Sequence, residues 1–474
     1  MSNPVESAQS VQGHLSLKEK LAYGAGDLGP AITANILVFF LLYFLVNVAG
    51  LNPALAGSIL LLGNIWDAVN DPMVGVVSDR TQHRWGRRLP WIVYGAIPFG
   101  ITYFLQWIVP ASNQWVLFGY YLAIALVSNT FFTVVNLPYT ALTPELTQDY
   151  DERTSLNSFR FAFSIGGSIL SLVLAQVIFA LYQSDPKLQY IVLGLVTAVL
   201  STLPLFWCAW GIWHRAIAAE VTREQIEAEA AMPLLQQIRI AFSNRAFLFV
   251  MGIYLCSWLA FQNTAAILPF YIVNWMQLPE TSVTQAAIAV QITALLMLAV
   301  WNQVSQRIGK KGAYFLGISL WLVGQIGLMM LRPEQTNLVY PLAVVVGFGV
   351  STAYLIPWSM LPDVIELDEL QTGQRREGIF YSFMTLGQKI SRGVGLFAVG
   401  VVLRQAGFIE RVAGQPMPEQ PVAATEAIRL ATGVFPAVLL VISLILAYFY
   451  PITREIHAEV LLKLKARREQ QKLS

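Results

Sequence analysis

Long apolar runs separated by short polar connections constrain this chain more than any other feature of its sequence. A helix needs roughly 20 apolar residues to span a bilayer, and about twelve runs approach or exceed that length. The chain is 56% hydrophobic and only 12% charged, whereas roughly 25% of residues are charged in soluble domains. We therefore predict an all-α integral membrane protein with twelve transmembrane helices, near residues 29–49, 54–78, 89–110, 115–143, 156–182, 188–213, 244–274, 282–306, 312–331, 337–361, 378–403 and 428–450.

Basic residues gather in alternate connections between these runs. Arg87 and Arg88 follow the second run, Lys310 and Lys311 follow the eighth, and the tail over 454–472 is basic as well. By the positive-inside rule, both termini are expected on the cytoplasmic side of the plasma (inner) membrane. The net charge of +2 gives no indication of a nucleic-acid partner.

Corresponding features in the two halves of the chain indicate an internal repeat. Gly86-Arg87-Arg88 follows the second run, and Gly309-Lys310-Lys311 follows the eighth. Parallel repeats of this kind are typical of transporters that hold substrate between two six-helix bundles at mid-membrane. The predicted organisation is a cytoplasmic N-terminal segment, a first bundle, a cytoplasmic helical linker, a second bundle and a cytoplasmic tail, over 1–20, 21–213, 214–243, 244–450 and 451–474.

Residues 65–72 read IWDAVNDP and place polar side chains inside the second apolar run. Positions i, i+3 and i+4 share one face of a helix, so Asp67, Asn70 and Asp71 are expected to point the same way. A carboxylate near the bilayer centre costs roughly 2.5 to 3.5 kcal/mol, and two like charges one turn apart repel each other. Such a face favours Na⁺ or a proton as its partner. The alternative is a structural pairing with other helices or with a buried arginine.

Several motifs together resemble the glycoside-pentoside-hexuronide:cation symporters, the melibiose permease-like branch of the major facilitator superfamily. They are IWDAVNDP, GVVSDRTQHRWGRRLPW, NLPYTALTPELTQDYDERTSLNSFRF and REGIFYSFMTLGQK. The resemblance implies the major facilitator fold, two pseudo-symmetric six-helix bundles that alternate between inward- and outward-open states. It also implies a coupling-cation site for Na⁺ or H⁺ at Asp67, Asn70, Asp71 and Thr133, with no cofactor and no other metal. A threonine in that position otherwise bonds to the backbone of its own helix.

The same resemblance suggests a substrate site, although part of the family pattern is missing. The acidic residues that hold a galactoside in melibiose permease are replaced here by Ala31 and Asn136, and the helix-1 lysine beside them is replaced by Pro30. Alternatives are a structural pair or cap for Asp27, core packing for Tyr354 and a gate salt bridge for Arg160. The expected substrate-binding residues are Asp27, Asn136, Thr140, Arg160, Tyr354 and Lys389.

Charged residues at the expected cytoplasmic ends of the spans resemble the ionic locks of this superfamily. The candidates for a gate are Asp79, Arg80, Arg153 and Asp363. The alternative is a solvated charged loop, which has a similar composition.

These features predict a secondary active symporter that couples a small polar solute, a sugar or glycoside, to a Na⁺ or H⁺ gradient. A lysophospholipid carrier of the same fold is the alternative, because the helix-1 and helix-4 carboxylates are absent. An intramembrane enzyme is disfavoured because no second aspartate-rich motif lies inside a span. An ATP-driven pump is disfavoured because the sequence has no phosphate-binding glycine-rich loop. Gly166 and Gly167 fit helix packing better than a dimer face, so we expect a monomer.

Overall fold

The computed structural model describes residues 15–147, 150–223, 234–373, 376–410 and 418–473, and all the regular secondary structure in them is helical. Within these residues, nine helices are long and apolar enough to cross a membrane. The helix α12, Thr281–Met330, is two spans joined at Gly309. Counting it twice and adding α4, Pro53–Asp79, and the shorter α5, Leu89–Leu105, makes the twelve spans expected. The predicted all-α fold is confirmed.

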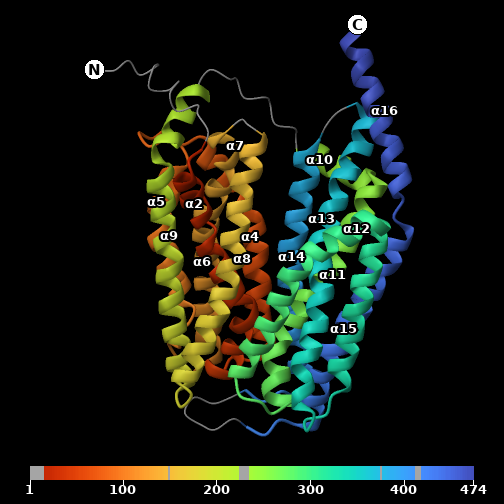
Figure 1. Ribbon diagram of the computed structural model, residues 1–474. Helices are drawn as coiled ribbons and strands as arrows, with labels where there is room; N and C mark the ends of the chain where they lie inside the picture. Colours follow the sequence, from red (N-terminus) through yellow and green to blue (C-terminus); the bar gives the residue numbers. More distant parts are fainter. Residues whose placement is uncertain (1–14, 148–149, 224–233, 374–375, 411–417, 474) are drawn as a thin grey trace. The chain divides into compact units, whose positions relative to one another are not determined.

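Two compact units make up the chain, Met1–Glu229 with Ile409–Glu419 and Ala230–Phe408 with Gln420–Ser474. Figure 1 shows each unit as a bundle of long helices that run side by side. The other elements of the first unit are α2 Leu17–Ala25, α3 Leu28–Ile36, η1 Leu37–Leu41, η2 Phe44–Val48, α6 Gln114–Ala141, α7 Thr143–Leu146, α8 Tyr150–Leu181 and α9 Pro186–Arg223. Those of the second are α10 Leu234–Ser243, α11 Arg245–Phe270, η3 Tyr271–Trp275, η4 Thr336–Leu338, α13 Val339–Thr372, α14 Glu377–Gln405, α15 Val422–Phe449 and α16 Arg454–Leu473.

Asparagine side chains begin three of the spans. Asn52 caps α4 by accepting a hydrogen bond from the Ala54 N–H at 3.0 Å. Asn113 caps α6 and Asn244 caps α11 in the same manner. Because the first four N–H groups of a helix lack an intrahelical partner, an asparagine oxygen at this position satisfies a donor that would otherwise remain unbonded.

The two glycines of the repeated turn both have a positive φ angle. Gly86 has a φ of 76° and Gly309 a φ of 79°. Positive φ values of this size favour glycine because a Cβ atom would clash with the backbone. The left-handed turn sets Arg87 and Arg88 in the first unit, and Lys310 and Lys311 in the second, at the start of the following span. The sequence repeat therefore corresponds to a repeated positive φ angle at its glycine.

The first span is broken in the middle of the sequence YGAGDLG. The helix α2 ends at Ala25 and α3 begins at Leu28, so Gly26 and Asp27 lie at the interruption. The glycines on either side permit very close helix packing. A Cβ atom on Gly29 would lie 2.2 Å from the Ser201 carbonyl oxygen of α9. The motif is thus a packing device as well as the setting for Asp27.

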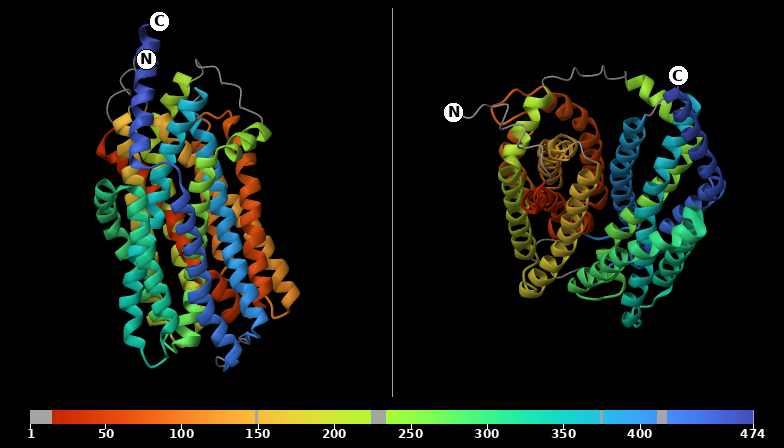
Figure 2. Two further views of the ribbon diagram at one scale, coloured as in Figure 1. Left: turned by 90° about the vertical axis from the view of Figure 1, so that its right-hand side faces the viewer. Right: turned by 45° about the horizontal axis from the view of Figure 1, so that its top comes forward.

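Helices cover the described parts of the predicted helical linker and of the tail. The helix α9 continues from the sixth span to Arg223, and α10 covers 234–243 before the seventh span. The tail forms the helix α16, which begins beside α13 and leads away from the bundle (Figure 2). The predicted middle of the linker, 224–233, lies outside the described residues. The cytoplasmic position of both segments stays a prediction.

Gly29→Ala is expected to destabilise the first unit by about 1 to 3 kcal/mol, because the added methyl group overpacks the contact between α3 and α9. The measurement is the unfolding temperature of the purified protein in detergent. Gly166→Ala in α8 is the matched control, since a Cβ atom there meets no atom within 4 Å. Equal unfolding temperatures for the two variants would contradict the close contact.

Candidate functional site: a carboxylate pair between two helices

The polar residues of IWDAVNDP lie on the side of α4 that faces α6. Asp67 is 2% exposed and Asn70 is 4% exposed, while Asp71 is half-buried. Val69 and Met73, on the opposite side of the same turns, are more than half exposed. The helix continues through Pro72 as far as Asp79. The acidic residues are therefore directed into the bundle rather than outward.

Two interhelical contacts fix the register of α4 against α6 around these carboxylates. The Trp66 indole N–H donates to Thr130 Oγ1 at 2.9 Å, and Asn129 Nδ2 donates to the Gly63 carbonyl oxygen at 2.7 Å. Asn129 approaches so closely that a Cβ atom on Gly63 would lie 3.1 Å from its amide nitrogen. The helices α4 and α6 run in the same direction. One turn beyond the contact between Gly63 and Asn129, Asp67 therefore faces the residue four positions after Asn129.

That residue is Thr133, and its hydroxyl lies between the two aspartates. The hydroxyl oxygen Oγ1 is 3.0 Å from Asp67 Oδ1 and 3.0 Å from Asp71 Oδ1. A hydroxyl has one proton and two acceptor lone pairs, so it donates to only one carboxylate at a time. Thr133 is itself 1% exposed. The Thr133 hydroxyl therefore bonds to side chains of α4, and not only to the backbone of its own helix.

This arrangement can bind a small cation. Two carboxylate oxygens and one hydroxyl oxygen converge within hydrogen-bonding distance, and all three are hard ligands of the kind that suit Na⁺. Repulsion between the carboxylates falls when a cation or a shared proton joins them. Asn70 is buried beside them, and its Nδ2 atom has no hydrogen-bond partner among the described residues. Its predicted role as a ligand stays a prediction.

In the first unit, the structure pairs two of the predicted substrate residues with each other. Asp27 Oδ2 lies 3.5 Å from Arg160 Nε, and the two side chains are 14% and 22% exposed. This geometry corresponds to the structural-pair alternative for Asp27. Asn136 is half-buried on α6. Thr140, by contrast, donates its hydroxyl to the Leu137 carbonyl oxygen of its own helix at 2.9 Å.

The other two predicted substrate residues belong to the second unit. Tyr354 on α13 packs against Trp258 and Phe261 of α11, with ring centroids 5.5 and 5.4 Å apart. Lys389 is half-buried on α14. The aromatic cluster around Tyr354 was missed by the sequence analysis, although Trp258 and Phe261 are spaced three residues apart on one helix face, which is the available signal.

Two of the four gate candidates take part in ion pairs, each within its own unit. Asp79 pairs with Arg88, and Arg87, just before α5, pairs with Glu145 of α7. Arg80 is exposed at the end of α4, and the side chain of Arg153 lies outside the described part of the chain. A gating role for these residues stays a prediction.

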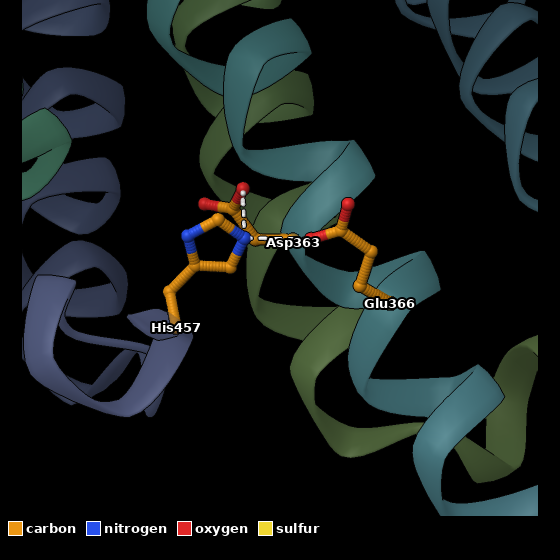
Figure 3. A group of neighbouring side chains, drawn as sticks. All are labelled: Asp363, Glu366 and His457. Carbon is orange, nitrogen blue, oxygen red and sulfur yellow. Dashed lines mark hydrogen bonds and ion pairs between the residues drawn. The ribbon is translucent and has the colours of Figure 1, made fainter. Parts of the chain in front are cut away.

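The fourth candidate, Asp363, belongs to a network in the second unit. The Lys310 ammonium donates to both of its carboxylate oxygens at 2.7 Å and to the Ser359 carbonyl oxygen at 2.6 Å. Figure 3 shows the His457 ring directed from α16 toward Asp363 and Glu366, and its Nε2 atom lies 3.3 and 2.7 Å from their oxygens. The three residues could hold a metal ion by spacing. Lys310 already engages both Asp363 oxygens, which favours an ion-pair network.

Comparison with known proteins agrees with this architecture. A nucleoside transporter, NupG, superposes with a TM-score of 0.63 over 92% of this chain and 99% of its own, at 14% identity, so the fold is shared. Among sequence relatives, an uncharacterized symporter of Synechocystis is 48% identical and covers 96% of this chain and 98% of its own length.

Two relatives whose names include a solute are more distant. A sodium-dependent lysophosphatidylcholine symporter of Danio rerio is 28% identical, covering 93% of this chain and 87% of its own. A putative sulfoquinovose importer of Salmonella typhimurium is also 28% identical, covering 84% and 83%. Residues 22–454 match the family described as MFS/sugar transport protein. The chain therefore belongs to the MFS/sugar transport protein family of membrane transporters.

Proposed function

We propose that this protein is a secondary active symporter that couples uptake of a polar solute to Na⁺ by alternating access. The observation that carries the proposal is the Thr133 hydroxyl, 3.0 Å from one oxygen of Asp67 and 3.0 Å from one oxygen of Asp71. Symporters are among the relatives of the chain, and the lysophosphatidylcholine relative is named as sodium-dependent. That name supports Na⁺ over H⁺ as the coupling ion.

The mechanism follows from the electrostatics of the pair. The two carboxylates meet at one hydroxyl in a largely buried site, where like charges repel each other more strongly than in water. A bound Na⁺ neutralises part of that charge and draws the two helices together. If solute binds better to this compact form, ion and solute strengthen each other's binding by the same factor, because coupling between two sites is reciprocal. The loaded protein then changes between its two open states.

We propose that the solute is a sugar, and more narrowly a sugar with an acidic substituent. The helix-1 and helix-4 carboxylates of the family pattern are replaced by Ala31 and Asn136, which removes negative charge from the solute site. Of the basic residues in the family pattern, Arg160 is kept in the first unit, where it lies 3.5 Å from Asp27, and Lys389 is kept in the second. An arginine guanidinium suits a planar or tetrahedral oxyanion, and the putative sulfoquinovose importer bears the name of a sulfonated sugar.

A lysophospholipid is the second candidate because of the lysophosphatidylcholine relative and the aromatic cluster of the second unit. There Tyr254 stacks on Trp258 with centroids 5.7 Å apart, and Trp358 stacks on Tyr381 at 6.0 Å. Aromatic rings of this kind suit an acyl chain or a choline cation as well as the flat face of a sugar.

Thr133→Val should raise the Na⁺ concentration needed for half-maximal stabilisation by about tenfold, because it removes a hydroxyl bonded to a charged group while keeping the side-chain shape. The measurement is the unfolding temperature of the purified protein as NaCl replaces KCl at constant ionic strength.

Thr133→Ser is the matched control, since it keeps the hydroxyl and should respond to Na⁺ as the unaltered protein does. A protein that is stabilised equally by Na⁺ and K⁺ would contradict a Na⁺ site. Stabilisation by lowered pH alone, without any effect of Na⁺, would assign the site to a proton instead.

A second experiment addresses the solute. Sulfoquinovose, a neutral methyl glycoside, a uronate and lysophosphatidylcholine are each added with and without Na⁺, and the unfolding temperature is measured. We expect the acidic sugars to stabilise the protein more strongly in Na⁺ than in K⁺, because ion and solute binding are coupled.

Asp71→Asn removes one charge of the pair with little change in shape, and in this variant the Na⁺ dependence of solute binding should disappear. Stabilisation by lysophosphatidylcholine alone would favour the second candidate. Acidic and neutral sugars acting equally would contradict the role given to the positive charges.

A further inference from the structure

A cavity of about 860 Å³ opens at the end of the second unit where α12, α13 and the tail meet. Its lining includes the cations Arg307, Lys310, Lys311 and Arg454 and the acids Asp363 and Glu455. With histidine neutral, these four cations and two acids give a net charge of +2. The cavity lies entirely within one unit and takes no part in the carboxylate site between α4 and α6.

The lining charges are not equally available to a ligand. Lys310 and Asp363 neutralise each other, because the Lys310 ammonium contacts both carboxylate oxygens. Glu455 is fully exposed at the rim. Lys311 donates to the Tyr448 carbonyl oxygen at 2.5 Å, which holds its ammonium at the cavity. Arg307 and Arg454 are exposed. Arg307, Lys311 and Arg454 therefore supply the positive charge that the Lys310–Asp363 pair leaves over in the cavity.

Tyr450 provides a second and independent indication of a ligand. It lines the cavity and is 3% exposed, yet its hydroxyl has no hydrogen-bond partner among the described residues. Burial raises the pKa of this phenol far above its usual value, and the nearby Asp363 carboxylate raises the pKa further. The group therefore stays protonated at physiological pH and remains a donor. A buried donor without an acceptor is costly, so an acceptor atom is expected in the cavity.

The surface around the cavity is apolar. Ile308 lines it and is 54% exposed, and Tyr448 and Phe449 at the end of α15 are 67% and 61% exposed. Lys311 Nζ lies 5.7 Å from the centroid of the Tyr448 ring. Because α12 and α15 are membrane-spanning helices, exposed apolar residues at their ends lie where the acyl chains and headgroups of a lipid leaflet meet.

We propose that this cavity binds a negatively charged phosphate group, supplied by an anionic phospholipid at the membrane edge, with Tyr450 as hydrogen-bond donor and Arg307, Lys311 and Arg454 as counter-charges. Basic pockets between transmembrane helices are known to suit anionic headgroups. The orphaned phenol donor is what distinguishes this cavity from a merely basic surface. The inference goes beyond the proposed transport function and does not depend on it.

The test measures binding of dioctanoyl phosphatidylglycerol, dioctanoyl phosphatidylcholine and inorganic phosphate to the full-length protein in neutral detergent, by microscale thermophoresis. We expect phosphatidylglycerol to bind at least about tenfold more tightly than phosphatidylcholine. Arg454→Gln should weaken its binding about fivefold, and Tyr450→Phe, which removes only the hydroxyl, about tenfold. Lys463→Gln is the charge-matched control on α16, outside the cavity, and should bind like the unaltered protein.

The results distinguish a lipid headgroup, a soluble anion and the absence of a phosphate site. Preference for phosphatidylglycerol, lost in Tyr450→Phe, supports the lipid source. Inorganic phosphate binding as tightly, with the same loss in Tyr450→Phe, supports a phosphate site served by a soluble anion. Equal binding of the two lipids, or Tyr450→Phe and Arg454→Gln variants that bind like Lys463→Gln, would overturn the proposal. Circular dichroism establishes that each variant is folded before its binding is compared.

Discussion

Two carboxylates held against one hydroxyl inside a membrane-spanning bundle are the constraint on which the rest of the first unit depends. In a largely buried setting, charges interact over short distances much more strongly than in water. The contact at Thr133 survives only if α4 and α6 keep their register to within a fraction of an ångström. The bonds from Trp66 to Thr130 and from Asn129 to Gly63 hold that register on the neighbouring turns. The polar site thus imposes close packing on the helices that carry it.

The first span also combines close helix packing with a buried polar contact. Small residues on the neighbouring helices allow α3 to approach closely, since a Cβ atom on Gly167 of α8 would lie 2.9 Å from the Leu28 carbonyl oxygen. The helix is interrupted at Gly26 and Asp27, where the Asp27 carboxylate meets Arg160. Interrupted helices are a common setting for solute and ion sites in transporters, because backbone groups released from the helix ladder become available to a ligand.

Some features of the molecule could be read from residue order because they depend on local geometry. The face shared by Asp67, Asn70 and Asp71 follows from the helical repeat, and the left-handed turns at Gly86 and Gly309 follow from the glycine in each repeat motif. Other features required contacts between distant segments. The Thr140 hydroxyl bonds to its own backbone, and nothing in the sequence indicated that His457, in the tail, would meet Glu366.

The sequence by itself determined that this protein belongs in a membrane, where its spans approximately lie and which helix face carries the buried charge. Hydropathy and the 3.6-residue period are properties of contiguous residues, so no tertiary structure is needed to evaluate them. Only the tertiary structure decided that Thr133 stands between the two aspartates, that Asp27 meets Arg160, and that the Tyr450 hydroxyl is enclosed without a partner. These depend on how helices distant in sequence are rotated and shifted against one another, and packing throughout the bundle sets those rotations.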